Sequence, residues 1–340
     1  MSSDFVLSSE IISVFEKNGV VLLKNMVNNK WQRILIDAIE EDIKKPGPFF
    51  HAYKTEEGKG NFHGNMRLWE HYQGLKDYCL NSPLPYLASQ LVNSNKINLF
   101  YDQLFVKEPE TNNRIRWHND QPYWPIRGWS VISFWTSIDP ISKENGPMEF
   151  IMKSHKWGKW YQPEHFAPGA SKAYEKNPEF EKIPDIESNR YKYDIISFDM
   201  NPGDILAFHA LVVHGSSGNI SKDGRRRGYA VRYTGKEVFY STEKGSHLDL
   251  RNPELEDGDC LDSKQYPVVW ENVKKVCPYC GQSTQTVFVH GHEQCVFCKT
   301  NVEPSCQGEV QESDSTDNYK KYSLNKYKTN NAKVNEIKYL

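Results

Sequence analysis

Between about Ile97 and Tyr240 the chain reads as a succession of short runs rich in β-branched and aromatic residues. Turn-forming groups of Asn, Pro, Gly and Ser separate these runs, which limits each one to the length of a single strand. A chain with many short strands buries their apolar sides by packing sheets face to face, so we expect a β-sandwich or jelly roll. The runs expected to form strands are Leu99–Val106, Trp129–Ile138, Met148–Met152, Ile195–Phe198, Asp204–Val213 and Tyr229–Tyr233.

Helical spacing is found mainly before these strands. Either of two adjacent serines can cap a helix over Glu10–Lys17, which Gly19 would stop, and Val20–Leu23 then predicts a strand. A second helix is expected over Trp31–Lys45, where isoleucines recur at helical spacing until a Pro-Gly-Pro sequence ends them. The predicted fold class is therefore mainly β with flanking helices.

The composition argues against several classes of protein. The 340 residues carry 42 Lys and Arg against 44 Asp and Glu, so no basic excess points to a nucleic-acid partner. No apolar run approaches the ~18 residues that cross a bilayer, and a secretory signal is not expected at the N-terminus. Five of the seven cysteines lie between Cys277 and Cys306, which suits a metal site in a reducing compartment. We expect a cytoplasmic protein that binds neither membrane nor nucleic acid.

A His-x-Asp pair follows the predicted strand Leu99–Val106 along the chain. On an extended chain His118 and Asp120 point to the same side, which presents two of the three ligands of a mononuclear iron site. The pattern alone is weak, because the sequence holds a second copy at His247-Leu248-Asp249. The first copy is favoured because aromatic residues surround it and a β-rich stretch with further histidines follows, whereas the second copy lies in a polar loop.

The third ligand of such a site should come from a later strand. His209 and His214 are five residues apart in one predicted apolar strand, so their side chains would face opposite ways. His214 stands at the end of this strand before Gly215, where a side chain can enter a cavity. His214 is therefore the favoured ligand, and His209 is expected to pack in the core.

Six short motifs follow one another in a characteristic order within about residues 10–245. They are Tyr101–Pro109, Trp117–Pro125, Asn145–Phe150, Ser154–Gly158, Pro202–Asp204 and His214–Ser216. Each stretch is modest alone, but together they resemble the phytanoyl-CoA dioxygenase family. The resemblance implies a double-stranded β-helix, which is a jelly roll, and an oxygenase that depends on Fe(II), 2-oxoglutarate and O2.

The resemblance also implies roles for individual residues. It makes His118, Asp120 and His214 the iron ligands. It places an arginine for the far carboxylate of 2-oxoglutarate on the strand after His214, where Arg226 is favoured and Arg225 is the alternative.

Further positions match the cosubstrate pocket of the family, although ordinary packing is an alternative for two of them, Trp135 and Gln103. The sequence departs from the family where the usual Pro-Gly-Ser-His reads Met152-Lys153-Ser154-His155. The residues implied to contact the cosubstrate are Ser216, Trp135, Gln103 and Lys107.

The cysteine-rich segment contains two Cys-x-x-Cys pairs, Cys277–Cys280 and Cys295–Cys298, at the spacing of a zinc ribbon. Four thiolates complete a tetrahedral shell, so the zinc would be structural and not catalytic. A redox pair or an iron centre is the alternative. His290 and His292 are spare ligands, and Cys306 is expected to remain free.

The expected organisation is an oxygenase domain over residues 1–250, a zinc-ribbon-like module over 272–307 and a flexible tail over 308–340. The expected activity is hydroxylation of a small-molecule metabolite with release of succinate and CO2. We favour a free metabolite over a CoA ester, because no adenine-nucleotide motif stands out. The alternative is a non-catalytic jelly-roll and zinc-ribbon protein that binds a ligand without turnover, and the ribbon is a possible site for a protein partner.

Overall fold

The computed structural model describes residues 5–54, 60–164, 174–272, 275–284, 286–289 and 292–302. The chain divides into two compact units, Met1–Val273 and Lys274–Leu340, and each is described by itself. The predicted tail over residues 308–340 lies outside the described residues, as do His290 and Cys306. Within the described part of the chain, no helix has both the length and the apolar character needed to cross a membrane.

The first unit is built on an eight-stranded sheet in which all the pairs are antiparallel. One strand, β14 (Val268–Glu271), pairs with β4, so this unit continues past residue 250, the expected end of the oxygenase domain. The order of the other strands is β1 (Val20–Leu23), β10 (Ile205–His209), β7 (Val131–Ser137), β12 (Arg226–Gly235), β4 (Lys96–Lys107), β3 (Asn61–Met66) and β2 (His51–Lys54).

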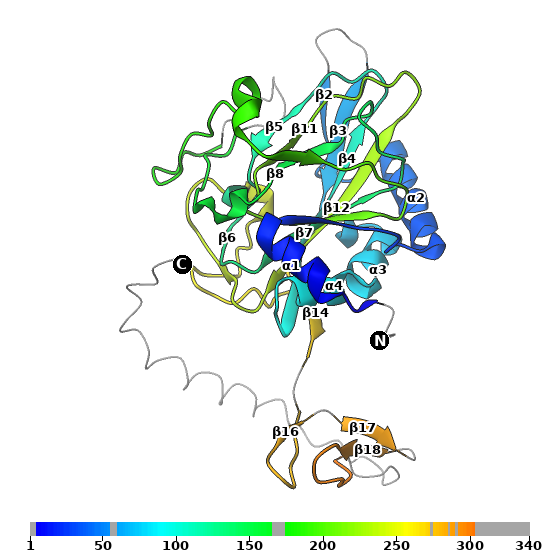
Figure 1. Cartoon of the computed structure of the whole chain (residues 1–340), viewed down its shortest axis with the longest axis vertical. Coiled ribbons are helices and arrows are strands. Elements are labelled where there is room, and N and C mark those ends of the chain that lie inside the picture. Colours follow the sequence, from blue (N-terminus) through cyan, green and yellow to red (C-terminus); the bar gives the residue numbers. More distant parts are fainter. Residues whose placement is uncertain are drawn as a thin grey trace. The chain divides into compact units, whose positions relative to one another are not determined.

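A second, four-stranded sheet faces the first. Phe150 of the small sheet and Phe208 of the large sheet belong to one hydrophobic cluster, with ring centroids 5.2 Å apart. Figure 1 shows the small sheet on the side of β12 that is opposite to the helices α3 and α4. The two facing antiparallel sheets confirm the expected mainly β, jelly-roll core. The order of the small sheet is β5 (Ile115–His118), β11 (His214–Ser216), β8 (Met148–Ile151) and β9 (Ile195–Ser197).

Short segments connect these strands. A two-stranded ladder joins β6 (Ile126–Arg127) to β13 (Phe239–Tyr240). Short 3-10 helices lie at Leu68–Glu70, Gln121–Tyr123, Ser154–Trp157, Glu187–Lys192 and Leu248–Leu250.

The two predicted helices form where their capping residues place them. Helix α1 (Ser9–Asn18) begins after Ser8, whose side chain accepts a hydrogen bond from the backbone of Ile11. It ends at Gly19, which has the left-handed φ of 78° that glycine adopts without strain. Helix α2 (Asn29–Lys44) is capped in the same way by Asn28.

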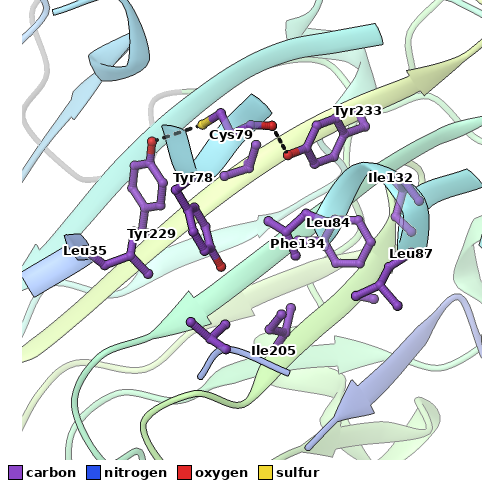
Figure 2. Packing of buried hydrophobic residues seen from close by; sticks show 14 of the residues in the cluster. Leu35, Tyr78, Cys79, Leu84, Leu87, Ile132, Phe134, Ile205, Tyr229 and Tyr233 are labelled. Carbon is purple, nitrogen blue, oxygen red and sulfur yellow. Dashed lines mark hydrogen bonds between the residues drawn. The ribbon is translucent and has the colours of Figure 1, made fainter. Parts of the chain in front are cut away.

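The structure adds two helices that the sequence did not predict, α3 (Gln73–Asn81) and α4 (Leu84–Leu91). Neither helix has a side-chain hydrogen bond at its N-cap, so this start signal is absent, although prolines lie at the start of α4, a position that suits them. Both helices are held by packing, because Tyr78, Cys79 and Leu87 are buried against the large sheet. Figure 2 shows these side chains meeting Phe134 and Tyr233 of the sheet.

One predicted strand is wrong in a way that matters for the site. The run Asp204–Val213 was expected to be continuous, but β10 ends at His209 and β11 begins at His214. The turn between them is closed by His209, whose Nδ1 accepts from the backbone of Leu211 at 3.0 Å. The backbone of Val213 then donates to Ser154 Oγ at 2.7 Å. The apolar residues of this turn are buried, so their hydrophobicity does not distinguish the turn from a strand.

Strand β4 carries a carboxyl group into the helix-covered side of the large sheet. Asp102 is buried, and its Oδ2 accepts from the backbone of Trp69 at 3.0 Å and from the hydroxyl of Tyr229. Its Oδ1 has no hydrogen-bond partner among the described residues. Burial raises the pKa of Asp102 from 3.8 to about 7, because the charged form is poorly solvated there. The hydroxyl of Tyr229 also contacts Cys79 Sγ at 3.4 Å (Figure 2).

Replacing Asp102 with Asn should change how stability depends on pH. Between about pH 4 and pH 7 the folded protein retains a proton on Asp102 that the unfolded chain has lost, so the free energy of unfolding falls as pH rises. The slope from one such group is at most about 1.4 kcal/mol per pH unit. Urea unfolding of the metal-free protein should therefore show the wild type losing stability relative to Asp102→Asn across this range. A difference that is constant with pH would contradict this role.

Candidate metal centre and adjoining cavity

Three ionisable side chains converge between the two sheets. His118 ends β5, Asp120 follows two residues later, and His214 begins β11 directly opposite His118 in the ladder. Asp120 Oδ1 lies 3.4 Å from His118 Nε2 and 3.8 Å from His214 Nε2. One ligand atom from each residue lies within 4.8 Å of the others, and all three residues are buried. The structure thus brings together the three side chains that the sequence proposed as metal ligands.

The hydrogen bonds of the two imidazoles fix which nitrogen faces the centre. His118 Nδ1 lies 2.7 Å from the carbonyl oxygen of Arg116, and His214 Nδ1 lies 3.0 Å from that of Val212. A carbonyl oxygen only accepts, so Nδ1 carries the proton and Nε2 presents its lone pair to the centre. Two imidazole nitrogens and one carboxylate on one side form the facial triad of mononuclear Fe(II) oxygenases, which leaves positions open for other ligands.

The charges in the centre suit a divalent metal. Burial acts to raise the pKa of Asp120, but His214, His118 and Arg232 together lower it below its ordinary value. Burial and the neighbouring His118 lower the pKa of His214 to about 4. At neutral pH the site therefore holds a carboxylate and a neutral His214 imidazole, which are the forms that bind metal.

The triad opens into a cavity between the sheets. Most of its wall is apolar, so a bound molecule would be separated from bulk water. Among the described residues that line it, Asp120 is the sole carboxylate, and two arginines supply positive charge. The lining residues outside the triad are Phe105, Ile115, Trp135, Met148, Phe208, Gly215, Ser216, Arg226, Ala230 and Arg232.

The arginine triplet divides between the cavity and the surface. Arg226 is 1% exposed and lines the cavity, where its Nε and Nη2 donate to the carbonyl of Gly146 at 3.1 and 2.9 Å. Its Nη1 has no partner among the described residues. Burial lowers the pKa of Arg226 to about 10, so it remains charged at neutral pH. Arg225 instead pairs with Glu40 and Glu108 outside the cavity.

A second buried cation lies beside Arg226. Lys107 is directly opposite Arg226 in the β4–β12 ladder, and its Nζ donates to Ser216 Oγ at 2.8 Å and to the carbonyl of Ser217 at 2.5 Å. Burial and the positive charge of Arg226 lower the pKa of Lys107. Two adjacent buried cations without a carboxylate between them favour an anion at this end of the cavity.

The remaining residues implied for the cosubstrate pocket lie on the same face of the large sheet. Trp135 lines the cavity, and the guanidinium of Arg226 lies 5.1 Å from its ring centroid. Gly228 makes this possible, since a Cβ there would lie 2.0 Å from the Trp135 ring. Gln103 is buried opposite Ala230 in the ladder, but it is not among the residues that line the cavity.

The structure reveals one charged cavity residue that sequence reasoning missed. Arg232 is 3% exposed and lines the cavity together with the triad. It lies six residues after Arg226 on β12, and an even spacing along a strand places two side chains on one face. This even spacing could have predicted from the sequence that Arg232 shares a strand face with Arg226.

The alternative histidines have other surroundings. His209 Nε2 lies 2.9 Å from the carbonyl of Trp129, and the two rings are tilted by 45° with centroids 4.3 Å apart. Burial lowers the pKa of His209 to about 3. His247, from the second His-x-Asp pair, lies at the start of a 3-10 helix and belongs to neither of the candidate metal groups found among the described residues.

A second hollow reaches the triad from another side. His118 lines both this hollow and the cavity. Tyr123, one of the aromatic residues that follow the His-x-Asp pair, also lines the hollow. The polar residues of its wall are Arg116, Gln162 and Glu164, with an ion pair of 3.1 Å between Arg116 and Glu164.

The second unit carries the other candidate metal group. This unit contains two short antiparallel hairpins. In the first, β15 (Lys275–Val276) pairs with β16 (Ser283–Thr284), and in the second, β17 (Thr286–Val289) pairs with β18 (His292–Cys295). The Sγ atoms of the four cysteines lie within 4.8 Å of one another, and none of the four is in a disulfide. The group consists of Cys277, Cys280, Cys295 and Cys298.

The chain is similar to known proteins in sequence and in structure. A family model described as phytanoyl-CoA dioxygenase matches residues 15–228. A probable phytanoyl-CoA dioxygenase of Caenorhabditis elegans is 24% identical over 256 residues, which is 68% of this chain and 77% of that protein. The peroxisomal phytanoyl-CoA dioxygenase of Homo sapiens is 24% identical over 267 residues, 71% of this chain and 72% of that protein.

Solved structures share the fold. The non-heme α-ketoglutarate-dependent carbocyclase SnoK from nogalamycin biosynthesis matches with a TM-score of 0.63 and 18% identity, over 77% of this chain and 96% of that chain. EctD from S. alaskensis, with 2-oxoglutarate and 5-hydroxyectoine, matches with a TM-score of 0.58 and 17% identity, over 76% of this chain and 87% of that chain. The family match covers more than half of the chain, and the His-Asp-His triad is assembled. The chain belongs to the phytanoyl-CoA dioxygenase family of Fe(II)/2-oxoglutarate-dependent dioxygenases.

Proposed function

We propose that this protein hydroxylates a small-molecule metabolite, using Fe(II), 2-oxoglutarate and O2 and releasing succinate and CO2. The observation that carries the proposal is the buried triad at one cavity with the unpartnered Nη1 of Arg226. When bound, the iron and its cosubstrate supply the activation of O2. The protein's own residues hold these groups in place and exclude water.

The donor set fits both groups. The iron would be bound by Nε2 of His118, a carboxylate oxygen of Asp120 and Nε2 of His214. Arg226 would bind the far carboxylate of 2-oxoglutarate through Nη1, since guanidinium and carboxylate form strong charge-assisted hydrogen bonds. Ser216, whose hydroxyl accepts a hydrogen bond from Lys107, lines the same cavity as Arg226. Trp135 would contact the bound cosubstrate. An anion there compensates the buried charge of Arg226 and Lys107, which supports the assignment.

Asp120 argues against halogenation. A carboxylate that occupies the third protein position leaves no vacancy for a halide ligand, so the default outcome is transfer of a hydroxyl group. The aromatic and aliphatic wall of the cavity would shield the substrate from solvent while it reacts.

We further propose that Cys277, Cys280, Cys295 and Cys298 bind a structural zinc ion. Four cysteine sulfurs in one small cluster match a closed tetrahedral shell. The oxygenase domain, a zinc-ribbon-like module over residues 272–307 and a terminal tail would then have separate roles, in a reducing compartment such as the cytoplasm. Tyr279 and Phe297 stand exposed in the two Cys-x-x-Cys pairs, which suits a protein partner.

The first test is turnover of the cosubstrate alone. Protein loaded with Fe(II) and 2-oxoglutarate should form succinate when O2 is admitted, because the triad and Arg226 suffice to hold both groups. His118→Ala should reduce succinate formation to the level without iron. His247→Ala removes the histidine of the other His-x-Asp pair and should leave the rate unchanged. Wild-type protein that binds 2-oxoglutarate but forms no succinate, with or without candidate metabolites, would favour a non-catalytic binding protein.

Arg226 and Arg225 provide a matched pair of variants. Arg226→Met should weaken 2-oxoglutarate binding about 10- to 100-fold, since it removes a charged hydrogen bond to the far carboxylate. Arg225→Met breaks only partly exposed ion pairs and should leave this affinity unchanged. Calorimetric titration of the Mn(II)-loaded protein with 2-oxoglutarate measures both. If Arg225→Met weakened binding and Arg226→Met did not, the two roles would be exchanged.

The cysteine cluster should affect stability and not chemistry. Cys277→Ala should lower bound zinc from one ion per chain to none and make the second unit sensitive to protease, while succinate formation persists. Cys260→Ala is the control, because Cys260 is exposed and lies outside the cluster. Metal analysis by mass spectrometry and limited proteolysis check these outcomes. A folded Cys277→Ala protein without succinate formation would show that the two metal sites are not independent.

A further inference from the structure

Arg232 is a buried cation whose hydrogen bonds are incomplete. Its Nε and Nη1 have no partner among the described residues, although the side chain is 3% exposed. The guanidinium lies 4.4 Å from the ring centroid of Tyr101 and 5.7 Å from that of Trp124. Contact with aromatic faces holds the guanidinium in place but supplies no hydrogen-bond acceptor for its N–H groups. A buried N–H group without an acceptor costs free energy.

The rings that hold Arg232 are themselves fixed. Trp124 Nε1 donates to the hydroxyl of Tyr101 at 2.9 Å, and the two rings meet edge to face with centroids 5.8 Å apart. Phe105 adds a third ring, 6.0 Å from the guanidinium. All three rings are buried, so Arg232 is held in a rigid setting at the cavity wall. Preorganisation of this kind lowers the cost of binding a ligand.

Arg232 is separate from the proposed cosubstrate clamp. Arg226 and Arg232 lie six residues apart on one strand, so their Cα atoms are about 20 Å apart. Ser133 lies directly opposite Arg232 in the β7–β12 ladder, and its Oγ donates to Asp120 Oδ2 at 3.4 Å. The triad therefore lies near the Arg232 end of the cavity wall, while Arg226 serves the other end.

The charges of the loaded site still leave positive charge to be compensated. A ferrous ion and a 2-oxoglutarate dianion cancel each other, and Asp120 cancels one of the two arginines that line the cavity. One arginine charge then remains even if Lys107 is neutral. Among the described residues, no carboxylate forms an ion pair with Arg232. Buried cations without a partner favour an anionic ligand.

We propose that Arg232 binds a carboxylate of the substrate beside the metal centre, so that the protein oxidises a small carboxylic acid. This inference rests on the proposed function, since it assigns the substrate class of the same cavity. Phe105, which also lines the cavity, would contact the apolar part of that acid, while Tyr101 and Trp124 hold the guanidinium of Arg232. Arg232 could equally bind the carboxylate of 2-oxoglutarate that is next to its keto group. The experiment below distinguishes a substrate carboxylate from this cosubstrate carboxylate.

The test compares acids with their neutral amides. Protein loaded with Mn(II) and 2-oxoglutarate is titrated calorimetrically with hexanoate and hexanamide, and with 4-phenylbutyrate and 4-phenylbutyramide. The wild type should bind at least one acid about tenfold or more tightly than its amide, as a charged hydrogen bond implies. Arg232→Met and Arg232→Gln both remove the charge and should abolish this preference while 2-oxoglutarate binding is retained. If one variant fails to fold, the other decides.

Three results overturn the proposal. Wild-type protein without a preference for either acid would show that Arg232 does not bind a substrate carboxylate. Variants that keep the preference would assign the anion site to another residue. Variants that lose 2-oxoglutarate affinity, as Arg226→Met should, would assign Arg232 to the cosubstrate. A wild-type protein that does not bind 2-oxoglutarate with Mn(II) would instead contradict the proposed function.

Discussion

Strand β12 lies between β4 and β7 and forms a ladder with both, so each of its side chains has one of two surroundings. Tyr229, Val231 and Tyr233 face the helices and complete the larger hydrophobic core. Arg226 and Arg232 lie on the alternate face and line the cavity. A shift of one residue in this ladder would exchange the two sets, burying the arginines under the helices and removing their positive charges from the cavity. The site therefore depends on the register of this strand.

The same ladder explains how the protein tolerates several buried charges. Arg226 is held by a backbone carbonyl and an aromatic ring, Lys107 by a hydroxyl and a carbonyl, and Arg232 by aromatic rings. None of these contacts supplies a negative charge. A metal ion held by Asp120, a dicarboxylate cosubstrate and an acidic substrate would complete the electrostatics of the cavity, and the wall of the site is arranged for ligands before they arrive.

Local signals predicted the parts of the fold that depend on short-range physics. The capping serine and Gly19 mark the two ends of the first helix, and runs rich in β-branched and aromatic residues marked the central strands of the large sheet, β10, β7, β12 and β4. The same signals missed the short helices α3 and α4, which depend on packing against the sheet, because side-chain caps are absent there. The same signals predicted β10 and β11 as one strand, because the residues of the turn between them are buried and as apolar as those of a strand.

For the site, the sequence by itself determined the chemical types of the ligands. His118, Asp120 and His214 were identified because the side chains of a His-x-Asp pair share a face and a later histidine ends an apolar run. Only the tertiary structure decided which arginine of the triplet enters the cavity, and that Arg232 enters it as well. The physical reason is that these roles depend on strand register and on partners distant in sequence, such as Gly146 for Arg226, Glu40 for Arg225 and Tyr101 for Arg232.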